Sequence, residues 1–306
     1  MVNSIENMQS TRDILIEGFT ARLHREGLAP GSIDQYVRSV NALIGAFPER
    51  RPQDLSRDDV ETWIDMVARD VSPATTNLRI AALKRFYAYL VDREIVTGAN
   101  PTARLKASKL HRRKVDWLQA DEDQALLKAP TTPQERIVVG LLRHTGLRIG
   151  EARGLRVRDV DFERGEVRIH AAKSESGIRI VPIRGEAVVE LKTWLGYLDK
   201  HGRAAPDAYF LSTRNGTPMQ ANQARDLVKR CARRAGVRVT GDGTHDSSVS
   251  CHTLRRTFGS YLLNKGARLE TVARLLGHAD TRTTERCYAA LLPDTVRDDM
   301  WKALSA

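Results

Sequence analysis

Two short segments of the sequence place cationic side chains where they could bind an anion. Arg148 follows Gly146, and Glu151 lies three residues further on, within reach of the guanidinium group of Arg148. His252 and Arg255 are also three residues apart and therefore share one face of a helix. A histidine and an arginine suit a protein core poorly, whereas the N–H donors of arginine match the oxygens of a phosphate. These residues suggest a phosphate site.

Two further segments carry a histidine, a tyrosine and a lysine. His278 follows a glycine that should end a helix, and Tyr288 falls on the next helix, which we expect Asp280 or Thr281 to cap. Lys173 lies in a predicted turn between two strands. Taken singly, each residue has an ordinary interpretation, such as a surface arginine paired with an acid, a packed tyrosine or a solvated lysine. Only the combination of segments indicates chemistry.

The elements that must position these side chains form a mixed region that starts at Asp116. A capping box at residues 132–135, with proline at the first helical position, predicts a helix that ends at Gly146. Residues 157–183 change to an alternation with a period of two, which predicts a small antiparallel sheet of about three strands. Helices resume near Gly185 and continue toward the end of the chain.

The first part of the chain, up to about Arg104, is predicted to form four amphipathic helices. The clearest begins with Ser-Pro at residues 72–73, a helix N-cap followed by proline at the first helical position. Its apolar side chains recur at spacings of three and four, which predicts a bundle core. They are Ile80, Leu83, Tyr87 and Leu90. Asn-Pro at residues 100–101 ends the helical region, because proline lacks the N–H that a helix needs.

A basic segment without acidic residues joins the two regions. It contains Arg104, Lys106, Lys109, His111, Arg112, Arg113 and Lys114. A solvated linker is one interpretation of this segment. A linker in a protein clamped around DNA is another, because both of its flanks would then contact phosphates.

The composition is that of a basic globular protein. With 49 lysines and arginines against 38 aspartates and glutamates, the chain of 306 residues has a formal net charge of +11. This charge favours a polyanionic partner such as nucleic acid, because bound cations release counterions from phosphates. The length allows about two domains, and a hydrophobic fraction of 41% excludes the disordered, collagen and disulfide-scaffold classes.

Other features of the sequence bear on location and cofactors. No apolar stretch approaches the ~20 residues needed to cross a bilayer, and the N-terminus lacks the pattern of a secretory signal. We therefore expect a cytoplasmic protein that does not bind a membrane. Cys231, Cys251 and Cys287 show neither C-x-x-C spacing nor a cluster with histidine, which predicts reduced thiols and no zinc.

In their order along the chain, these segments resemble the tyrosine recombinase (phage integrase) family, and most closely its compact Xer-like members. The matching motifs are T-G-L-R-x-x-E at 145–151, the hairpin lysine with R-x-V-P at 179–182, H-x-L-R-R-T-F at 252–258, L-G-H at 276–278 and T-T-E-R-C-Y at 283–288. They span most of the second region. The N-terminal helices, with Asn-Pro after them, are similar to the core-binding domain of the family, though less specifically.

The resemblance implies a fold and a domain organisation. The fold would be mainly α with a small antiparallel β-sheet, in two domains that form a C-shaped clamp on DNA. Residues 1–104 would be a helical core-binding (SAM-like) domain, 105–115 a basic linker and 116–306 the catalytic domain. Residues 294–306 carry apolar side chains at a spacing of four. They would form a C-terminal helix that is donated to a neighbouring protomer, although packing on its own domain is the alternative.

The resemblance also implies site-specific recombination, in which DNA strands are cut and rejoined through a 3′-phosphotyrosyl intermediate. Arg148 and Arg255 would clamp the scissile phosphate, and His278 would add a hydrogen bond. Tyr288 would attack, with His252 as general base. No metal, cofactor or ATP is required.

Two further residues complete the implied mechanism. Lys173 would be the general acid for the leaving 5′-oxygen, and Glu151 would hold Arg148 or His252. We therefore expect the guanidinium, imidazole and ammonium groups to converge around one phosphorus, with the hydroxyl of Tyr288 in line.

The sequence departs from the family pattern at two places. Tyr288 lies ten residues after His278 where the family usually has nine, and Cys287 occupies the usual position. One residue rotates a side chain by ~100° around a helix, so the preceding loop must absorb the insertion. Tyr288 remains the predicted nucleophile, because a soft thiolate matches a phosphodiester poorly. The spacing from Lys173 to Arg179 is also one residue longer than in the Xer pattern.

The implied partner is double-stranded DNA bound by a tetramer on two sites, with a directionality factor as a further candidate partner. The basic residues assigned to DNA are Arg79, Lys84, Arg104, Lys106, Lys109, Arg112, Arg113 and Lys114. Two other functions stay open. A type IB topoisomerase-like relaxase would use the same chemistry as a monomer, and a catalytically silent DNA-binding regulator would not need Tyr288.

Overall fold

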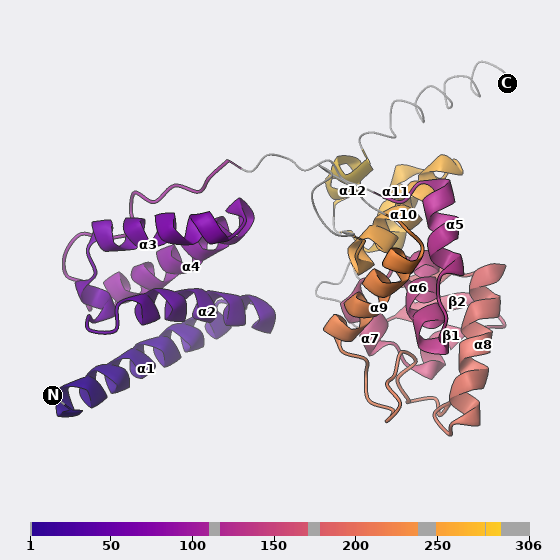
Figure 1. The fold of residues 1–306 in the computed structure, drawn as a ribbon, viewed down its shortest axis with the longest axis horizontal. Coiled ribbons are helices and arrows are strands. Elements are labelled where there is room, and N and C mark those ends of the chain that lie inside the picture. The colour runs from indigo at the N-terminus through magenta and orange to yellow at the C-terminus, as the bar shows by residue number, and fades with distance from the viewer. Residues whose placement is uncertain (1, 110–116, 171–177, 238–248, 279, 289–306) are drawn as a thin grey trace, which may run out of the picture. The chain divides into compact units, whose positions relative to one another are not determined.

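The computed structural model describes residues 2–109, 117–170, 178–237, 249–278 and 280–288, and it divides into two compact units, 1–112 and 113–306 (Figure 1). The described part is mainly helical with one antiparallel sheet of three strands, which confirms the predicted fold class. In the part of the chain that the structure describes, no helix combines the length and the apolar character that crossing a membrane requires.

The N-terminal unit contains four α-helices in its described part, as the sequence predicts. They are α1 (Val2–Arg25), α2 (Pro30–Ala46), α3 (Arg57–Asp70) and α4 (Pro73–Asp92), with a short 3-10 turn at Pro52–Asp54. α4 begins where expected, because the side chain of Ser72 accepts a hydrogen bond from the backbone N–H of Thr75. The predicted apolar stripe of α4 is buried in the core of this unit, and the hydroxyl of Tyr87 donates to the carbonyl of Pro52 at 2.8 Å.

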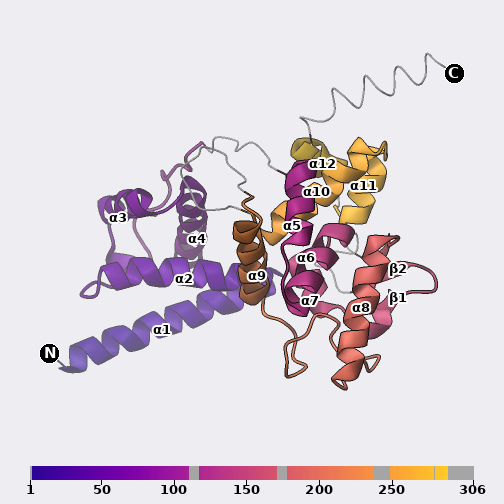
Figure 2. The same ribbon diagram turned by 45° about the vertical axis from the view of Figure 1, so that its right-hand side comes forward.

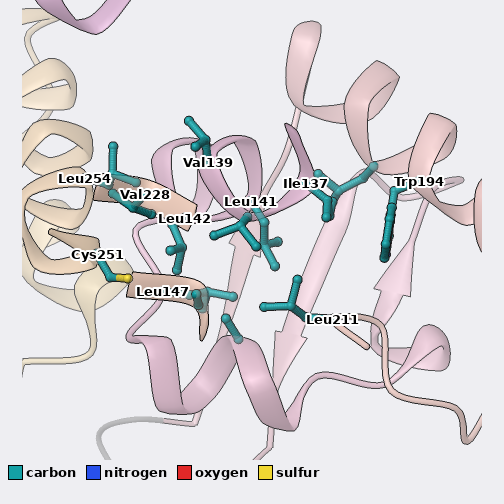
Figure 3. Close-up of a cluster of buried hydrophobic side chains, with 14 of the residues drawn as sticks. Ile137, Val139, Leu141, Leu142, Leu147, Trp194, Leu211, Val228, Cys251 and Leu254 are labelled. Atoms are coloured by element: carbon teal, nitrogen blue, oxygen red, sulfur yellow. The ribbon is translucent and has the colours of Figure 1, made fainter. Parts of the chain in front are cut away.

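The C-terminal unit is built around α6 (Pro133–Thr145). Its other described helices are α5 (Ala120–Lys128), α7 (Ile149–Gly154), α8 (Glu186–Lys200), α9 (Ala221–Arg234), α10 (Cys251–Asn264), α11 (Leu269–Leu276) and α12 (Thr281–Tyr288), with a 3-10 turn at Val157–Asp159. α6 contacts α8, α9 and α10, so its side chains fill the centre of the core. In Figure 3, Leu141 and Leu142 lie between Leu254 on one side and Trp194 on the other.

The ends of α6 follow the sequence prediction. The side chain of Thr132 accepts a hydrogen bond from the backbone N–H of Glu135, and the helix ends at Gly146 in the left-handed conformation, with φ of 62°. A side chain at Gly146 would collide with the ring of Phe258 on α10, since a Cβ there would lie 2.4 Å from the Phe258 Cδ1 atom. The chain therefore turns sharply at this point and leads directly into the segment that carries Arg148.

The sheet has the order β1 (Val160–Asp161), β2 (Glu166–Ile169), β3 (Arg179–Pro182), and both pairings are antiparallel. Val167 and Ile169 on β2 are buried. On β3 the inward face carries Arg179, with 7% of its side chain exposed, and Val181, whereas Ile180 is 50% exposed. The predicted alternation of inward and outward side chains is present on β3. Arg179 faces inward, although it is charged, because it pairs with a buried acidic side chain that is described below.

The last three described helices, α10, α11 and α12, lie together at one end of the C-terminal unit (Figure 1). α11 contacts both α10 and α12, and these helices lie together in both views of the ribbon (Figure 1, Figure 2). A second, smaller apolar cluster joins them to the sheet. It consists of Val181, Phe258, Leu263, Val272, Leu276 and Tyr288.

We expect Asp123→Ala to destabilise the C-terminal unit. Asp123 on α5 accepts a hydrogen bond from Nε of Arg143 on α6 at 2.6 Å, and the two side chains are only 13% and 6% exposed. Removing the carboxylate leaves a guanidinium buried without its counter-charge, which costs about 3 kcal/mol of unfolding free energy. Urea unfolding followed by circular dichroism measures the loss.

The control for this prediction is Asp92→Ala. Asp92 pairs with Arg22 in the N-terminal unit, but its side chain is 55% exposed, so its removal should cost less than about 1 kcal/mol. Equal effects of the two substitutions would contradict the argument from burial.

Candidate active site

Arg148 stands at the N-cap of α7, and Glu151 is the third residue of that helix. The backbone N–H of Arg148 donates to Oε2 of Glu151 at 2.8 Å, and its Nη1 donates to Oε1 at 2.9 Å. The predicted contact between these two side chains is therefore present. The side chain of Arg148 is 43% exposed, whereas that of Glu151 is 6% exposed. The guanidinium is thus fixed at one edge and open to a ligand at the other.

Arg255 reaches the same place from α10. Ser250 caps that helix, and Arg255 is one of the largest fully buried side chains among the described residues, with 2% exposed. Its Nη1 donates to the carbonyl of Gly146 at 2.6 Å, and its Nη2 donates to the carbonyl of Leu276. Burial lowers the pKa of this guanidinium, and the nearby positive charge of Arg148 lowers it further. Arg255 therefore joins the end of α6 to the end of α11.

Three arginines meet at the C-terminal end of α11. The carbonyls of Leu275, Leu276 and Gly277 accept hydrogen bonds from Arg179, Arg255 and Arg148, in that order. A helix C-terminus carries unpaired carbonyls and a partial negative charge, so it is a suitable anchor for cations. The two arginines predicted to clamp a phosphate thus lie together, although they come from distant parts of the sequence.

Arg179 is a member of this cluster that the sequence prediction did not include. In the sequence it stands out only as the first residue of the R-x-V-P motif. The sequence contains one signal that could have found it, because Arg179 has the same strand parity as the apolar Val181 and therefore shares its inward face.

The two histidines lie close to the arginines, and both have a lowered pKa, which favours the neutral imidazole. Nδ1 of His278 is 2.8 Å from the hydroxyl of Thr284, and burial together with Arg255 and Arg148 lowers the pKa of His278 to about 4. His252 reaches solvent. The pKa of His252 is also lowered, mainly by partial desolvation of the ring and to a smaller extent by the charges of Arg256 and Arg255. A neutral imidazole can accept a proton, as a general base must.

Tyr288 does not stand in line with the arginines, which differs from the sequence expectation. It is 1% exposed, lies in the smaller apolar cluster, and donates its hydroxyl hydrogen to the carbonyl of Arg256 at 3.1 Å. The ring of Trp117 lies 6.2 Å from its own. Burial raises the pKa of this phenol. In this conformation the hydroxyl is therefore shielded from an incoming phosphate.

Tyr288 lies in the smaller apolar cluster, and Cys287 packs against the same cluster. Cys287, at the position where the family usually has tyrosine, is half-buried, and the next side chain on α12 is rotated by ~100° from it. In the apolar cluster the ring of Tyr288 is desolvated and its hydroxyl donates to a carbonyl partner. An attack by Tyr288 requires the phenol to leave this pocket.

We expect Gly259→Ala to displace Tyr288 from its pocket. Gly259 lies on α10 beneath the phenol, and a Cβ there would be 2.1 Å from the Tyr288 hydroxyl oxygen and 2.5 Å from its Cζ. Both are closer than atoms can approach, so the ring must move, at a cost in stability of about 1–3 kcal/mol. Nitration of Tyr288 by tetranitromethane, mapped by mass spectrometry, should become several-fold faster.

Gly196→Ala is the matched control for this substitution. Gly196 lies on α8 with open space where its Cβ would be, so alanine should leave the nitration of Tyr288 unchanged. An unchanged nitration rate in Gly259→Ala would show that Gly259 does not maintain the inward position of the phenol.

The remaining predicted residues are distributed between the two units. Lys173, Arg112, Arg113 and Lys114 lie outside the described residues. In the N-terminal unit the guanidinium of Arg79 lies 5.6 Å from the ring centre of Trp63. Four other assigned cations, Lys84, Arg104, Lys106 and Lys109, are exposed. Among the described residues, no group of three or more histidine, cysteine or acidic side chains could hold a metal ion.

Comparison with family models identifies two matching segments. Residues 116–294 match the model described as the phage integrase family. Residues 15–97 match the model described as the phage integrase N-terminal SAM-like domain.

Similar proteins cover nearly the whole chain. The tyrosine recombinase XerC of Xylella fastidiosa is 32% identical over 280 residues, which cover 89% of this chain and 90% of that protein. The tyrosine recombinase XerD of Ralstonia nicotianae is 32% identical over 269 residues, with 85% and 84% covered.

Solved structures share the fold at lower sequence identity. The Tn1549 transposon integrase in complex with circular intermediate DNA has a TM-score of 0.69 and 21% identity, with 94% of this chain and 99% of that chain covered. A lambda integrase tetramer bound to a Holliday junction has a TM-score of 0.70 and 16% identity, with 90% and 76% covered.

Proposed function

This chain belongs to the phage integrase family of tyrosine recombinases and is a site-specific DNA recombinase, and we propose that Arg148, Arg255 and His278 hold the scissile phosphate that Tyr288 attacks. The observation that carries this assignment is the convergence of Arg148 and Arg255 on consecutive carbonyls at the end of α11, directly before His278. Three guanidinium groups and one carboxylate meet there, so the cluster has an excess of positive charge to offer a phosphate.

Fixed cations suit this reaction because charge accumulates in its transition state. When a phenol attacks a phosphodiester, the phosphorus passes through a five-coordinate, highly anionic state. Donors that are already oriented stabilise this state without having to reorganise, and the effect is largest where water is excluded. Arg255 is fully buried and held by two carbonyls, while Arg148 is partly open, so together they offer a rigid donor and an accessible one.

Proton transfer completes the proposed chemistry. A phenol titrates near pH ~10, so Tyr288 needs a base, and His252 takes its proton as the Oη–phosphorus bond forms. The bond from phosphorus to the 5′-oxygen breaks at the same time, and Lys173 supplies the proton that this oxygen gains. The 3′-phosphotyrosyl ester retains the energy of the original bond, so the reverse reaction with a second strand rejoins DNA without ATP.

The two units take different roles in this proposal. Residues 1–104 are the core-binding domain, 105–115 the linker and 116–306 the catalytic domain; the segment 294–306, for which the sequence predicts exchange with a neighbouring protomer, lies outside the described residues. Double-stranded DNA is bound through the basic residues assigned above, with four protomers on two sites. The lambda integrase, a protein of the same fold, forms a tetramer on a Holliday junction, which supports this assembly. A directionality factor would act on the same complex.

A selection for covalent attachment tests the proposed function. The full chain is incubated with a pool of nicked duplexes of randomised sequence, in which the nick lets a short fragment diffuse away and traps the intermediate. Complexes that survive detergent are sequenced, and mass spectrometry identifies the amino acid joined to the 3′-phosphate. We expect attachment through Tyr288 to a defined sequence. Recovery of no covalent complex, or attachment elsewhere, would overturn the assignment.

Plasmids carrying the selected sequence give the second part of the test. Recombination requires two copies of the site on one supercoiled plasmid and yields products with exchanged flanks. A relaxase would instead remove supercoils from a plasmid that carries no copy at all.

A further inference from the structure

We propose that Arg179 is a positioning residue of the phosphate site, which holds Glu151 so that the guanidinium of Arg148 stays fixed and its charge stays available to DNA. This inference rests on the proposed function. It concerns a strand residue that has no assigned part in the chemistry described above.

The contacts of Arg179 are those of a buried clamp. Its Nη1 lies 3.2 Å from Oε1 of Glu151 and its Nη2 lies 2.9 Å from Oε2, while its Nε donates to the carbonyl of Leu275 at 2.6 Å. Only 7% of its side chain and 6% of that of Glu151 are exposed. Arg179 therefore uses all three of its nitrogens within the protein and ties β3 to α7 and α11.

Arg148 holds the same carboxylate in a weaker way. Its side chain makes one contact with Glu151, at 2.9 Å, and one with the carbonyl of Gly277, at 3.0 Å, and it is 43% exposed. The two arginines thus share one negative charge unequally. Arg179 grips both oxygens in a buried setting, where an ion pair is screened least.

This inequality has a consequence for the phosphate site. With Arg179 in place, the charge of Glu151 is balanced by a cation that solvent hardly reaches, so the charge of Arg148 is left for an external anion. Without Arg179, the whole charge of Glu151 would fall on Arg148. The exposed guanidinium would then be drawn onto the carboxylate and would offer less positive charge to a phosphate.

The local backbone is shaped to admit this side chain. Gly277 follows α11 in the left-handed conformation, with φ of +61°, and a Cβ there would lie 2.7 Å from Nη1 of Arg179. The arginine therefore passes over a position without a side chain, directly before His278. Its contact with Leu275 anchors the end of the helix that also receives Arg148 and Arg255.

The test compares single-turnover cleavage by Arg179→Met and by the wild type, at saturating concentrations of the selected nicked duplex. Methionine keeps the apolar stem and removes the charge. We expect the rate to fall about 10- to 100-fold. Losses of this size follow when a residue that only orients a functional side chain is removed, as is known for the residues that orient metal ligands. The affinity for DNA and its dependence on salt should stay unchanged, because all three nitrogens of Arg179 already bond to groups of the protein and no phosphate contact is lost.

Two comparisons separate positioning from direct contact and from a general structural role. Arg168→Met is the matched control, because Arg168 lies on the neighbouring strand and pairs with Asp161 at 2.9 Å outside the arginine cluster, so its rate should equal that of the wild type. Arg179→Lys should recover part of the rate, because it restores the charge without the fork of donors. A reduced salt dependence of DNA binding would show direct contact with a phosphate and overturn the proposal.

A double-mutant cycle gives the decisive readout. If Arg179 acts through Glu151, then Arg179→Met should have little further effect in a Glu151→Gln protein. If the wild type cleaves DNA and the two losses multiply, or if Arg179→Met cleaves at the wild-type rate, the proposal is wrong while the proposed function stands. If the wild type forms no covalent product, the proposed function fails and this inference fails with it.

Discussion

Tyr288→Phe should abolish covalent attachment to DNA while leaving DNA binding intact. The substitution removes only the oxygen that would join the phosphorus, and no other hydroxyl on α12 can replace it at the same position on the helix. Gel electrophoresis of the selected nicked duplex after denaturation measures the covalent product, and we expect it to fall below detection. Because the phenol donates a single hydrogen bond, to the carbonyl of Arg256, the fold should lose no more than about 1 kcal/mol.

Cys287→Ala is the control that tests whether the thiol, and not the phenol, is the nucleophile. Cys287 occupies the position at which the family usually has tyrosine, and it lies half-buried beside Tyr288. If the thiol were the nucleophile, Cys287→Ala would lose the covalent product and Tyr288→Phe would keep it. We expect the opposite pattern.

The inward position of Tyr288 adds a condition to this prediction. The hydroxyl faces the Arg256 carbonyl and not the arginine cluster, so DNA cleavage must include a step in which α12 rearranges. Under this view the cleavage rate of the wild type is limited in part by release of the phenol. Gly259→Ala, which expels the ring, should then accelerate cleavage as long as the protein stays folded, and an unchanged rate would show that release of the phenol is not limiting.

Much of the fold could be predicted because its signals are local. The caps of α4 and α6 are set by residues within four positions of one another, and the alternation on β2 is visible in a handful of residues. The contact between Arg148 and Glu151 is equally local, since three residues separate them at the start of one helix. These features need no knowledge of which distant segments meet.

The parts of the site that escaped prediction depend on distant contacts. Arg179 faces inward because its guanidinium donates to Glu151 and to the carbonyl of Leu275, and neither partner is near it in the sequence. The orientation of Tyr288 depends on the apolar cluster around its ring and on the space above Gly259. Residue types and spacing predicted which side chains could take part, but tertiary packing decides which way each of them points.

Arg255→Lys should reduce the cleavage rate about 100- to 1,000-fold, the loss caused by removing one oriented donor from an oxyanion site. Arg255 donates to Gly146 and Leu276 through different nitrogens, which fixes the plane of its guanidinium. A lysine ammonium retains the charge but cannot satisfy both carbonyls and a phosphate oxygen with the same geometry. The wild-type and variant rates are compared in single turnover on the selected duplex.

The affinity for DNA distinguishes a transition-state role of Arg255 from simple phosphate binding. DNA binding draws on many cations along the backbone, so the loss of one buried donor should change the dissociation constant little. A donor aimed at charge that develops only during attack affects the rate and not the affinity. If Arg255→Lys weakened DNA binding and slowed cleavage by the same factor, Arg255 would bind the phosphate equally well in the ground state and in the transition state. The rigid clamp at the end of α11 would then contribute orientation but no specific stabilisation of the five-coordinate state.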